Sequence, residues 1–441
     1  MIQNILPFLF VLGVLIFVHE LGHFLVARFH GVRVITFSLG FGPKIIKFTR
    51  GGTEYCISIV PLGGYVKMAG ENPDDPRAGQ PDEFLSKTKW QRFQILIAGP
   101  VMNIVTAVVI MAGVLAQGDR IPQYQDEPAV VGIVADGSPA AAAGISVGDR
   151  IVAVEGEAIE TWDDLFMEIG TRPDRQITVA VRRDGSERAV TLKTRALGRF
   201  EIGDIGVAPN IHPMIVNIEA GDRPGRRAGL RANDVVVAVD GLVVPTRDQL
   251  IEMISKSADR EIVLRVRRDG QELDIRATPE LVGSRGMLGV QISDAFKEFQ
   301  PTPLEAIQLS VERNWESSGY IFRTLGGLFT GDTSVRQLQG PVGIAQLSGE
   351  SAEAGWLRLF ELMAMLSINL GILNLMPVPV LDGGHILIMM LEGLARRDFS
   401  MRVKEKMLLA GFVVLMMLMV TVIYNDLTRV EWIERLMPWR Q

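Results

Sequence analysis

His19-Glu20-Leu21-Gly22-His23 is the stretch of sequence that decides the fold. It lies inside an apolar run from Ile5 to Phe29, and the first part of this run carries no charged residue. On an α-helix, positions i and i+4 differ by about 40° in direction and about 6 Å in height, so the two imidazoles point the same way. The spacing therefore predicts that His19 and His23 bind one zinc ion, while Glu20 acts on a water at the metal.

The alternative for this stretch is a pair of core histidines whose hydrogen bonds are satisfied within the protein. The metal is favoured because insertion scales give about 3 kcal/mol as the cost of one charged group at the middle of a bilayer. Two of the chain's 5 histidines stand at ligand spacing around a glutamate. The single cysteine, Cys56, excludes a disulfide within the chain and a cysteine cluster, so a zinc site must use His, Asp or Glu.

The composition indicates a membrane protein with sizeable soluble parts. The chain has 441 residues, of which 48% are hydrophobic, and its net charge of -6 gives no indication of nucleic-acid binding. Two or three domains fit this length. A transmembrane helix needs about 20 apolar residues, and four segments qualify: Ile5–Ala27, Ile95–Ala116, Leu357–Met376 and Met407–Ile423, the last being short unless flanking residues contribute.

The charges between these segments predict the topology. Lys and Arg residues gather between the first and second segments and again, at 396–406, between the third and fourth. The positive-inside rule places both connections in the cytoplasm. Both termini and the long region 117–356 then lie on the other side, which is the periplasm in a bacterium, and the catalytic site lies toward the cytoplasmic side.

Residues 32–68 are predicted to form strands. Val32–Leu39 and Thr53–Val60 are rich in β-branched and aromatic residues, and Pro61-Leu62-Gly63-Gly64 turns the chain into Tyr65–Met68. A sheet at membrane depth is tolerated where it is buried in protein or lines a cavity. We therefore weigh a membrane-associated sheet equally against an ordinary cytosolic hairpin.

An internal repeat occupies the region between the second and third apolar segments. Residues 148–156 match residues 233–241, and residues 181–185 match residues 266–270, both with an offset of 85 (234 − 149 and 269 − 184). The two copies, at 128–213 and 214–293, resemble PDZ domains in the circularly permuted order of bacterial proteases. PDZ modules capture peptides by strand addition; shielding of the site is the alternative that we favour.

The segment 301–356 is predicted to be peripheral. Apolar residues recur there at 4-3-4-3-4 spacing, which predicts an amphipathic helix on the membrane surface or on the PDZ pair. This stripe consists of Val311, Trp315, Ser318, Phe322, Leu325 and Phe329. Gly340-Pro341-Val342-Gly343 is predicted to form a loop after it.

A second group of polar residues follows the third apolar segment, within 357–441. Pro377 and Pro379 cannot continue a regular helix, so the backbone must unwind there, which requires a protein-lined cavity. Asp382 is then presented at the break as the third zinc ligand; a helix N-cap is the alternative. Asn374 could donate a hydrogen bond to a developing oxyanion.

These two halves together resemble the site-2 protease family. The residues that carry the resemblance are His19 to His23 and the pattern Asn374…Pro377-x-Pro379-x-Leu381-Asp382-Gly383-Gly384. Residues 61–68 and Ala98-Gly99-Pro100-Val101-x-Asn103 are also similar to that group, and the tandem PDZ insert narrows it to the bacterial regulator-of-sigma-E protease type.

The resemblance implies a fold and an activity. The fold is a multi-domain membrane protein, with a four-helix transmembrane metalloprotease core and a membrane-associated β-sheet in 1–117 and 357–441, plus two periplasmic PDZ (α+β) domains. The activity is that of an inner-membrane protease with one Zn2+, which cuts single-pass membrane proteins such as anti-sigma factors and remnant signal peptides after an upstream periplasmic protease. Residues expected to bind substrate or oxyanion are Asn374, Pro377, Pro379, Gly63 and Gly64.

Two other classes of function compete with this one. A membrane-anchored PDZ adaptor with a non-catalytic metal site would keep its zinc and its function after Glu20→Gln. A zinc transporter would need polar acceptors along several helices, and the second segment offers only Asn103 and Thr106.

Overall fold

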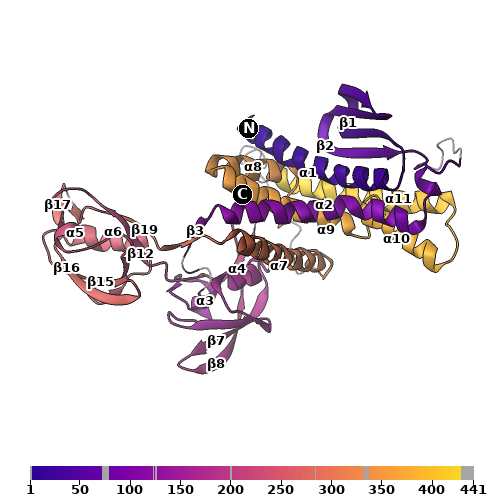
Figure 1. The fold of residues 1–441 in the computed structure, drawn as a ribbon. Coiled ribbons are helices and arrows are strands. Elements are labelled where there is room, and N and C mark those ends of the chain that lie inside the picture. The colour runs from indigo at the N-terminus through magenta and orange to yellow at the C-terminus, as the bar shows by residue number, and fades with distance from the viewer. Residues whose placement is uncertain are drawn as a thin grey trace. The chain divides into compact units, whose positions relative to one another are not determined.

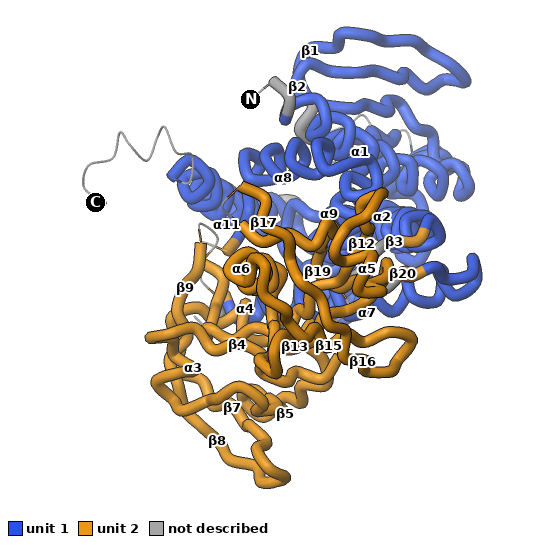
Figure 2. The backbone as a smooth tube through the Cα atoms, turned by 90° about the vertical axis from the view of Figure 1, so that its left-hand side faces the viewer, with its two compact units in different colours: residues 1–117, 300–327, 338–441 blue, residues 118–299, 328–337 orange. Residues whose placement is uncertain are grey.

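The computed structural model describes residues 2–71, 79–122, 124, 127–198, 201–283, 285–330, 333 and 337–428. It divides into two compact units, drawn in blue and orange in Figure 2. Unit 1 comprises Met1–Gln117, Gln300–Gly327 and Leu338–Gln441, and unit 2 comprises Gly118–Phe299 and Leu328–Gln337.

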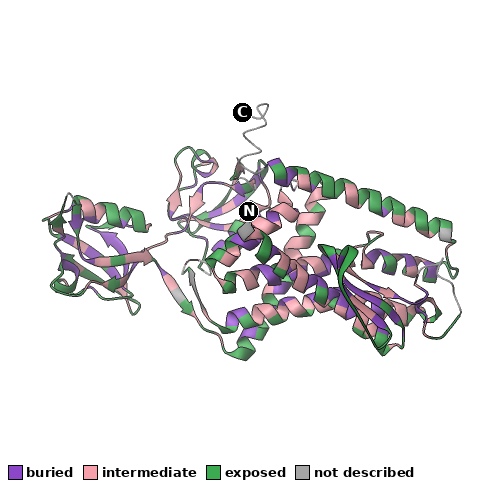
Figure 3. Ribbon diagram, turned by 90° about the horizontal axis from the view of Figure 1, so that it is seen from above, coloured by how far each residue is buried: buried purple, intermediate pink, exposed green. Residues whose placement is uncertain are grey.

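Unit 1 is built mainly from helices (Figure 1). These are α1 (Ile2–Phe29), α2 (Lys89–Ala116), α7 (Pro303–Thr330), α8 (Pro341–Ala354), α9 (Trp356–Leu375), α10 (Asp382–Leu394), α11 (Met401–Thr428) and the short 3-10 helix η1 (Phe84–Ser86). In its described part, four helical stretches are long and apolar enough to cross a membrane: Asn4–Phe29, Lys89–Ala116, Trp356–Leu375 and Arg402–Thr428. The four predicted segments are thus present, and the fourth is lengthened at both ends. Only 11% of its apolar window is buried, and exposed faces of the helices are green in Figure 3.

The predicted strands of residues 32–68 form β1 (Val34–Arg50) and β2 (Thr53–Met68). Each strand bends and pairs more than once, since residues 34–39 pair both with 64–68 and with 54–57, while 44–50 pair with 53–58. Residues 53–58 therefore have a neighbour on each side, whereas 64–68 and 44–50 have one pairing partner among the described residues. The inner side of this sheet packs Val34, Phe37 and Val66 with Ala27 of α1 and Ile95 of α2.

Helix α7 contains the predicted amphipathic stripe, but its apolar face points outward. Val311, Trp315 and Phe322 are exposed, whereas Ser310 and Asn314 are buried. The hydroxyl of Ser310 donates a hydrogen bond to the carbonyl of Val108 in α2, 2.7 Å away. A helix that turns polar residues inward and apolar residues outward suits an apolar surrounding.

The prediction of a loop at Gly340–Gly343 is wrong. Gly340 is the N-cap of α8, and Pro341 occupies its first turn, where a missing N–H costs nothing. The buried carboxylate of Asp426 in α11 accepts the N–H groups of Gly340 and Gly343 at 3.1 and 2.9 Å. In the sequence, glycine and proline indicate a turn. In the structure this stretch begins a helix, because the distant carboxylate accepts two N–H groups at the start of α8.

Unit 2 contains the internal repeat as two copies of one arrangement. The strands and helices of the first copy are β4 (Ile133–Val134), α3 (Pro139–Ala142), β5 (Arg150–Val154), β6 (Glu157–Ala158), α4 (Trp162–Gly170), β7 (Gln176–Arg183), β8 (Ser186–Lys193), β9 (Arg195–Leu197), β10 (Ile202–Asp204) and β11 (Val207–Ala208). Those of the second are β12 (Pro213–Ile218), α5 (Pro224–Arg227), β13 (Val235–Val239), β14 (Leu242–Val243), α6 (Arg247–Lys256), β15 (Ile262–Arg268), β16 (Gln271–Ala277), β17 (Glu280–Val282), β18 (Arg285–Met287) and β19 (Val290–Asp294). Strands β3 (Asp119–Pro122) and β20 (Phe296–Phe299) pair with each other before and after the two copies.

The repeat extends to single hydrogen bonds. In the first copy, Arg183 donates to Asp149 at 2.7 Å and to the carbonyl of Gly144 at 3.0 Å. In the second, Arg268 donates to Asp234 at 2.7 Å and to the carbonyl of Gly229 at 2.9 Å. Each copy has its own apolar core, one around Trp162 and the other around Leu250. The offset of 85 residues therefore corresponds to a repeated fold.

Candidate metal centre

Helix α1 holds the first part of the candidate site. His19, Glu20 and His23 are all buried, and the Nε2 atoms of the two histidines are 3.2 Å apart. Position 22 in the same turn is glycine, and a Cβ there would lie 2.4 Å from the carbonyl oxygen of Ala98 in α2. The absence of a side chain at Gly22 lets the backbones of α1 and α2 approach closely, as is common between apolar helices.

The break after α9 supplies the third group. Helix α9 ends at Leu375, and α10 begins at Asp382. The carboxylate oxygen Oδ2 of Asp382 lies 3.1 Å from Nε2 of His19 and 3.4 Å from Nε2 of His23. The N-cap of α10 is Leu381, so the carboxylate of Asp382 faces the histidines instead of capping the helix.

The loop between α9 and α10 is tightly built. A Cβ at Gly383 would lie 2.3 Å from the carbonyl oxygen of Leu375, and one at Gly384 would lie 2.2 Å from that of Val378. Val380 has a φ of 119°, which a β-branched residue rarely adopts. The glycines and the strained valine together bring Asp382 back onto the end of the helix that precedes it.

Three ligand atoms from positions 363 residues apart (382 − 19) thus meet in one place. At zinc–ligand distances near 2.0–2.1 Å and tetrahedral angles, neighbouring ligand atoms are about 3.3 Å apart. The observed separations of 3.1, 3.2 and 3.4 Å fit this value. The two carboxylates of Glu20 and Asp382 also bring negative charge into a largely buried site, which a divalent cation would offset. The donor set therefore fits zinc.

Helix α2 forms the floor of the site. A Cβ at Gly99 would lie 2.3 Å from Nε2 of His23 and 2.9 Å from Cε1 of His19. Nδ1 of His23 donates a hydrogen bond to the carbonyl of Ile95 at 2.8 Å, and Nδ1 of His19 lies 3.1 Å from the amide of Asn103. None of these α2 residues was predicted to have a role at the site, although Gly99 and Asn103 belong to the Ala98–Asn103 pattern.

The predicted substrate-binding residues lie at different places. A Cβ at Gly64 would lie 2.9 Å from Cγ of Glu20, whereas Gly63 lies against the ring of Phe41. Asn374 is half-buried in the last turn of α9, and Pro377 and Pro379 follow in the non-helical loop. Of these five residues, the structure brings Gly64 beside the catalytic candidate.

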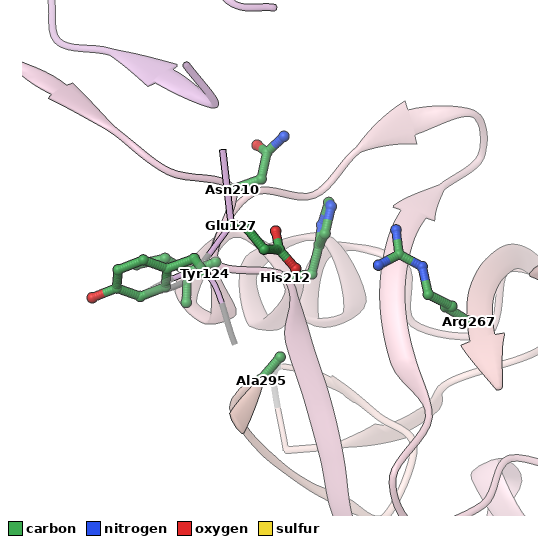
Figure 4. A pocket seen from close by; sticks show the side chains of 7 residues that line it. Tyr124, Glu127, Asn210, His212, Arg267 and Ala295 are labelled. Carbon is green, nitrogen blue, oxygen red and sulfur yellow. The ribbon is translucent and has the colours of Figure 1, made fainter. Parts of the chain in front are cut away.

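Unit 2 has a small pocket of its own (Figure 4). It is lined by Tyr124, Glu127, Asn210, Ile211, His212, Arg267 and Ala295. Burial lowers the pKa of His212, and its Nδ1 lies 2.9 Å from the carbonyl of Val244. None of the predicted site residues lines this pocket.

The family of the chain follows from comparison with known proteins. The model of Peptidase family M50 matches residues 7–418. The chain belongs to this family. As an M50 chain it is 35% identical over 451 residues to the regulator of sigma-E protease RseP of Salmonella typhimurium, covering 97% of this chain and 98% of that protein. It is 34% identical to the protein of the same name from Escherichia coli (strain K12), with the same coverage.

This M50 chain is also similar to a third relative and, over a short part, to a solved structure. A protein of Vibrio cholerae that is named as a zinc metalloprotease is 33% identical over 451 residues, covering 97% of this chain and 98% of that protein. Among solved structures, the PDZ domain of the SdrC-like protein from Listeria monocytogenes matches with 20% identity and a TM-score of 0.17, covering 19% of this chain and 86% of that one.

Proposed function

We propose that this M50 protein is an intramembrane zinc endopeptidase of the site-2 type, with His19, His23 and Asp382 as the ligands of one Zn2+. The observation that carries the proposal is the meeting of these three side chains beside Glu20, on and between apolar helices. Family membership and relatives named as zinc metalloproteases support the same activity.

The zinc, when bound, polarises a carbonyl group and makes a water acidic enough to react near neutral pH. Glu20 is the general base and acid of the reaction. Its carboxylate takes a proton from the attacking water and returns it to the leaving amide nitrogen, which splits the peptide bond. Glu20 is buried, so this proton stays within the site between the two steps.

The oxyanion that develops on the scissile carbonyl needs a donor besides the metal. Asn374 fills this role in our proposal, because its side-chain amide stands in the last turn before the α9–α10 break. Pro377 and Pro379 keep that loop free of helix, so that an extended substrate segment has room beside Asp382.

The substrate must be unwound before cleavage, since a helix covers its peptide bonds with its own hydrogen bonds. Residues 64–66 offer a strand edge for such a segment, because their pairing with 37–39 uses one side only among the described residues. Gly64 lies beside Glu20 at the start of this edge, with Gly63 before it. Main-chain pairing along it would place an extended segment of the substrate at the catalytic carboxylate.

The proposed substrates are single-pass membrane proteins of the anti-sigma-factor and remnant-signal-peptide type, which an upstream periplasmic protease has shortened. Two relatives are named regulator of sigma-E protease, and this name supports the choice of substrate. In the same proposal the chain lies in the bacterial inner membrane with both termini and the two repeat copies in the periplasm. The copies, at 128–213 and 214–293, are PDZ domains that exclude substrates with large periplasmic parts.

The experiment is co-expression with a truncated single-pass membrane protein. Wild type should release a cytosolic fragment, whereas Glu20→Gln and Asp382→Asn should not. Glu20→Gln should keep its zinc, because Glu20 is not a ligand in this proposal. A membrane-anchored PDZ adaptor predicts no difference in fragment release between wild type and Glu20→Gln. That result would replace the protease with the adaptor.

A further inference from the structure

Asn103 is a polar residue in the middle of the apolar helix α2, and it is completely buried. Its side-chain nitrogen lies 3.1 Å from Nδ1 of His19. Its backbone carbonyl accepts a hydrogen bond from the hydroxyl of Ser367 in α9, 2.8 Å away. Its side-chain oxygen Oδ1, also buried, has no hydrogen-bond partner among the described residues. An unpaired buried acceptor is costly, so this arrangement needs a reason.

The other ring nitrogen of His19 decides which end of the amide faces the histidine. Nε2 of His19 points at Nε2 of His23 and at Oδ2 of Asp382, where the metal is proposed. A neutral imidazole that binds a metal through Nε2 carries its hydrogen on Nδ1. An N–H group cannot bond to the amide NH2, so a half-turn of the amide must bring Oδ1 onto Nδ1 of His19.

The second histidine shows the same arrangement. Nδ1 of His23 lies 2.8 Å from the carbonyl of Ile95, which can only accept a hydrogen bond. Ile95 and Asn103 are both on α2, eight residues apart (103 − 95), on either side of Gly99. An oxygen acceptor on the outer nitrogen of each histidine would fix both rings from the same helix.

We propose that Asn103 is the positioning residue of His19: its side-chain oxygen accepts the Nδ1 hydrogen and holds Nε2 toward His23 and Asp382. This inference rests on the proposed zinc site. Metal-binding histidines commonly donate their other N–H to a carboxylate or carbonyl, and loss of such a partner lowers metal affinity by about 10- to 100-fold. In the alternative arrangement, Asn103 is the donor. Its Nδ2 group then donates a hydrogen bond to an Nδ1 atom of His19 that carries no hydrogen.

Zinc affinity of the purified full-length protein, measured by competition with a chelator, separates these cases. Asn103→Leu removes both the donor and the acceptor and should weaken binding by about 10- to 100-fold. Asn103→Asp keeps an acceptor and loses the donor, so it should stay near the wild-type affinity. Asn314→Leu, which removes a buried asparagine of α7, is the control and should match wild type.

These outcomes test the role of Asn103 separately from the proposed protease function. Wild-type affinity in Asn103→Leu, or an equal loss in Asn103→Asp and Asn103→Leu, overturns the role of Asn103 and leaves the zinc site in place. A wild-type protein that binds no zinc removes the proposed function itself. If Asn103→Leu does not fold, the NMR spectrum of Co2+-loaded wild type gives the answer: two slowly exchanging imidazole N–H signals support the inference, and one contradicts it.

Discussion

Gly99 and His23 are so close that a methyl group at position 99 would lie 2.3 Å from the Nε2 atom that faces the proposed metal. Real Cβ atoms do not approach a nitrogen to this distance, so α2 can pass under the two histidines only without a side chain. The α1–α2 contact and the site geometry therefore depend on the same glycine.

Gly99→Ala should abolish or strongly weaken zinc binding, because the added methyl group displaces His23 from the metal position. Gly113→Ala is the matched control, since Gly113 lies on the same helix and has open space around its Cβ position. Zinc content of both purified variants, measured by elemental analysis, checks this. Equal zinc in the two variants would show that the histidines do not need the floor formed by α2.

Gly64→Ala should reduce cleavage and leave zinc content near that of wild type. A Cβ at position 64 would lie within 2.9 Å of Ile16, of the carbonyl of Ser38 and of Glu20, so the strand edge and the proposed catalytic side chain must move apart. Gly13→Ala, with open space around its Cβ, should change neither quantity. Fragment release alongside zinc content is the measurement, and normal cleavage by Gly64→Ala would exclude the 64–66 edge as the place where substrate is held.

The first repeat copy should lose stability in acid through Asp149. The hydrogen bond from Arg183 lowers the pKa of the Asp149 carboxyl. A carboxyl with a lowered folded pKa stabilises the fold above its unfolded pKa, about 3.9, and this contribution is lost as the pH falls through the folded value. The free energy of opening of residues 150–193 in the full-length protein should therefore fall below about pH 4, as obtained from hydrogen exchange corrected for the intrinsic exchange rate at each pH. Asp149→Asn should remove this pH dependence; a persisting dependence would assign it to another group.

Glu392 should contribute more to stability than an exposed acidic residue nearby. Its buried carboxylate accepts the N–H of Phe399 at 2.9 Å and binds Lys404 at 2.7 Å, which joins the end of α10 to α11. Glu392→Ala leaves the ammonium group of Lys404 unpaired and should cost about 3 kcal/mol. Asp398→Ala removes an exposed pair with Lys89 and should cost less than about 1 kcal/mol. Thermal unfolding in detergent compares the two, and equal losses would contradict the difference.

Much of the fold could be predicted from the sequence because its signals are local or periodic. The four apolar segments, the strands of residues 32–68 and the offset of 85 residues all appear in the structure. The start of α8 could not be predicted, because the carboxylate that caps Gly340 and Gly343 belongs to Asp426, more than 80 residues later.

The candidate site, too, could be predicted from the sequence only where its residues follow a local pattern. His19, Glu20 and His23 share one helical turn, and Asp382 follows two prolines, so their patterns are visible in the sequence. Gly99 and Asn103 belong to the Ala98–Asn103 pattern, but this pattern does not give their position, because their place under the histidines depends on how α2 crosses α1. The position of the strand edge near Glu20 also depends on the structure: residues 53–58 have paired segments on both sides, whereas 64–66 have one on one side only among the described residues.

The most direct test of the account is the zinc content of the purified protein, measured per chain by elemental analysis. We predict about one zinc per chain in wild type and in Glu20→Gln, and a large loss in Asp382→Ala, because Asp382 supplies one of three ligands and Glu20 supplies none. No zinc in wild type, or the same zinc content in Asp382→Ala as in wild type, would contradict the account.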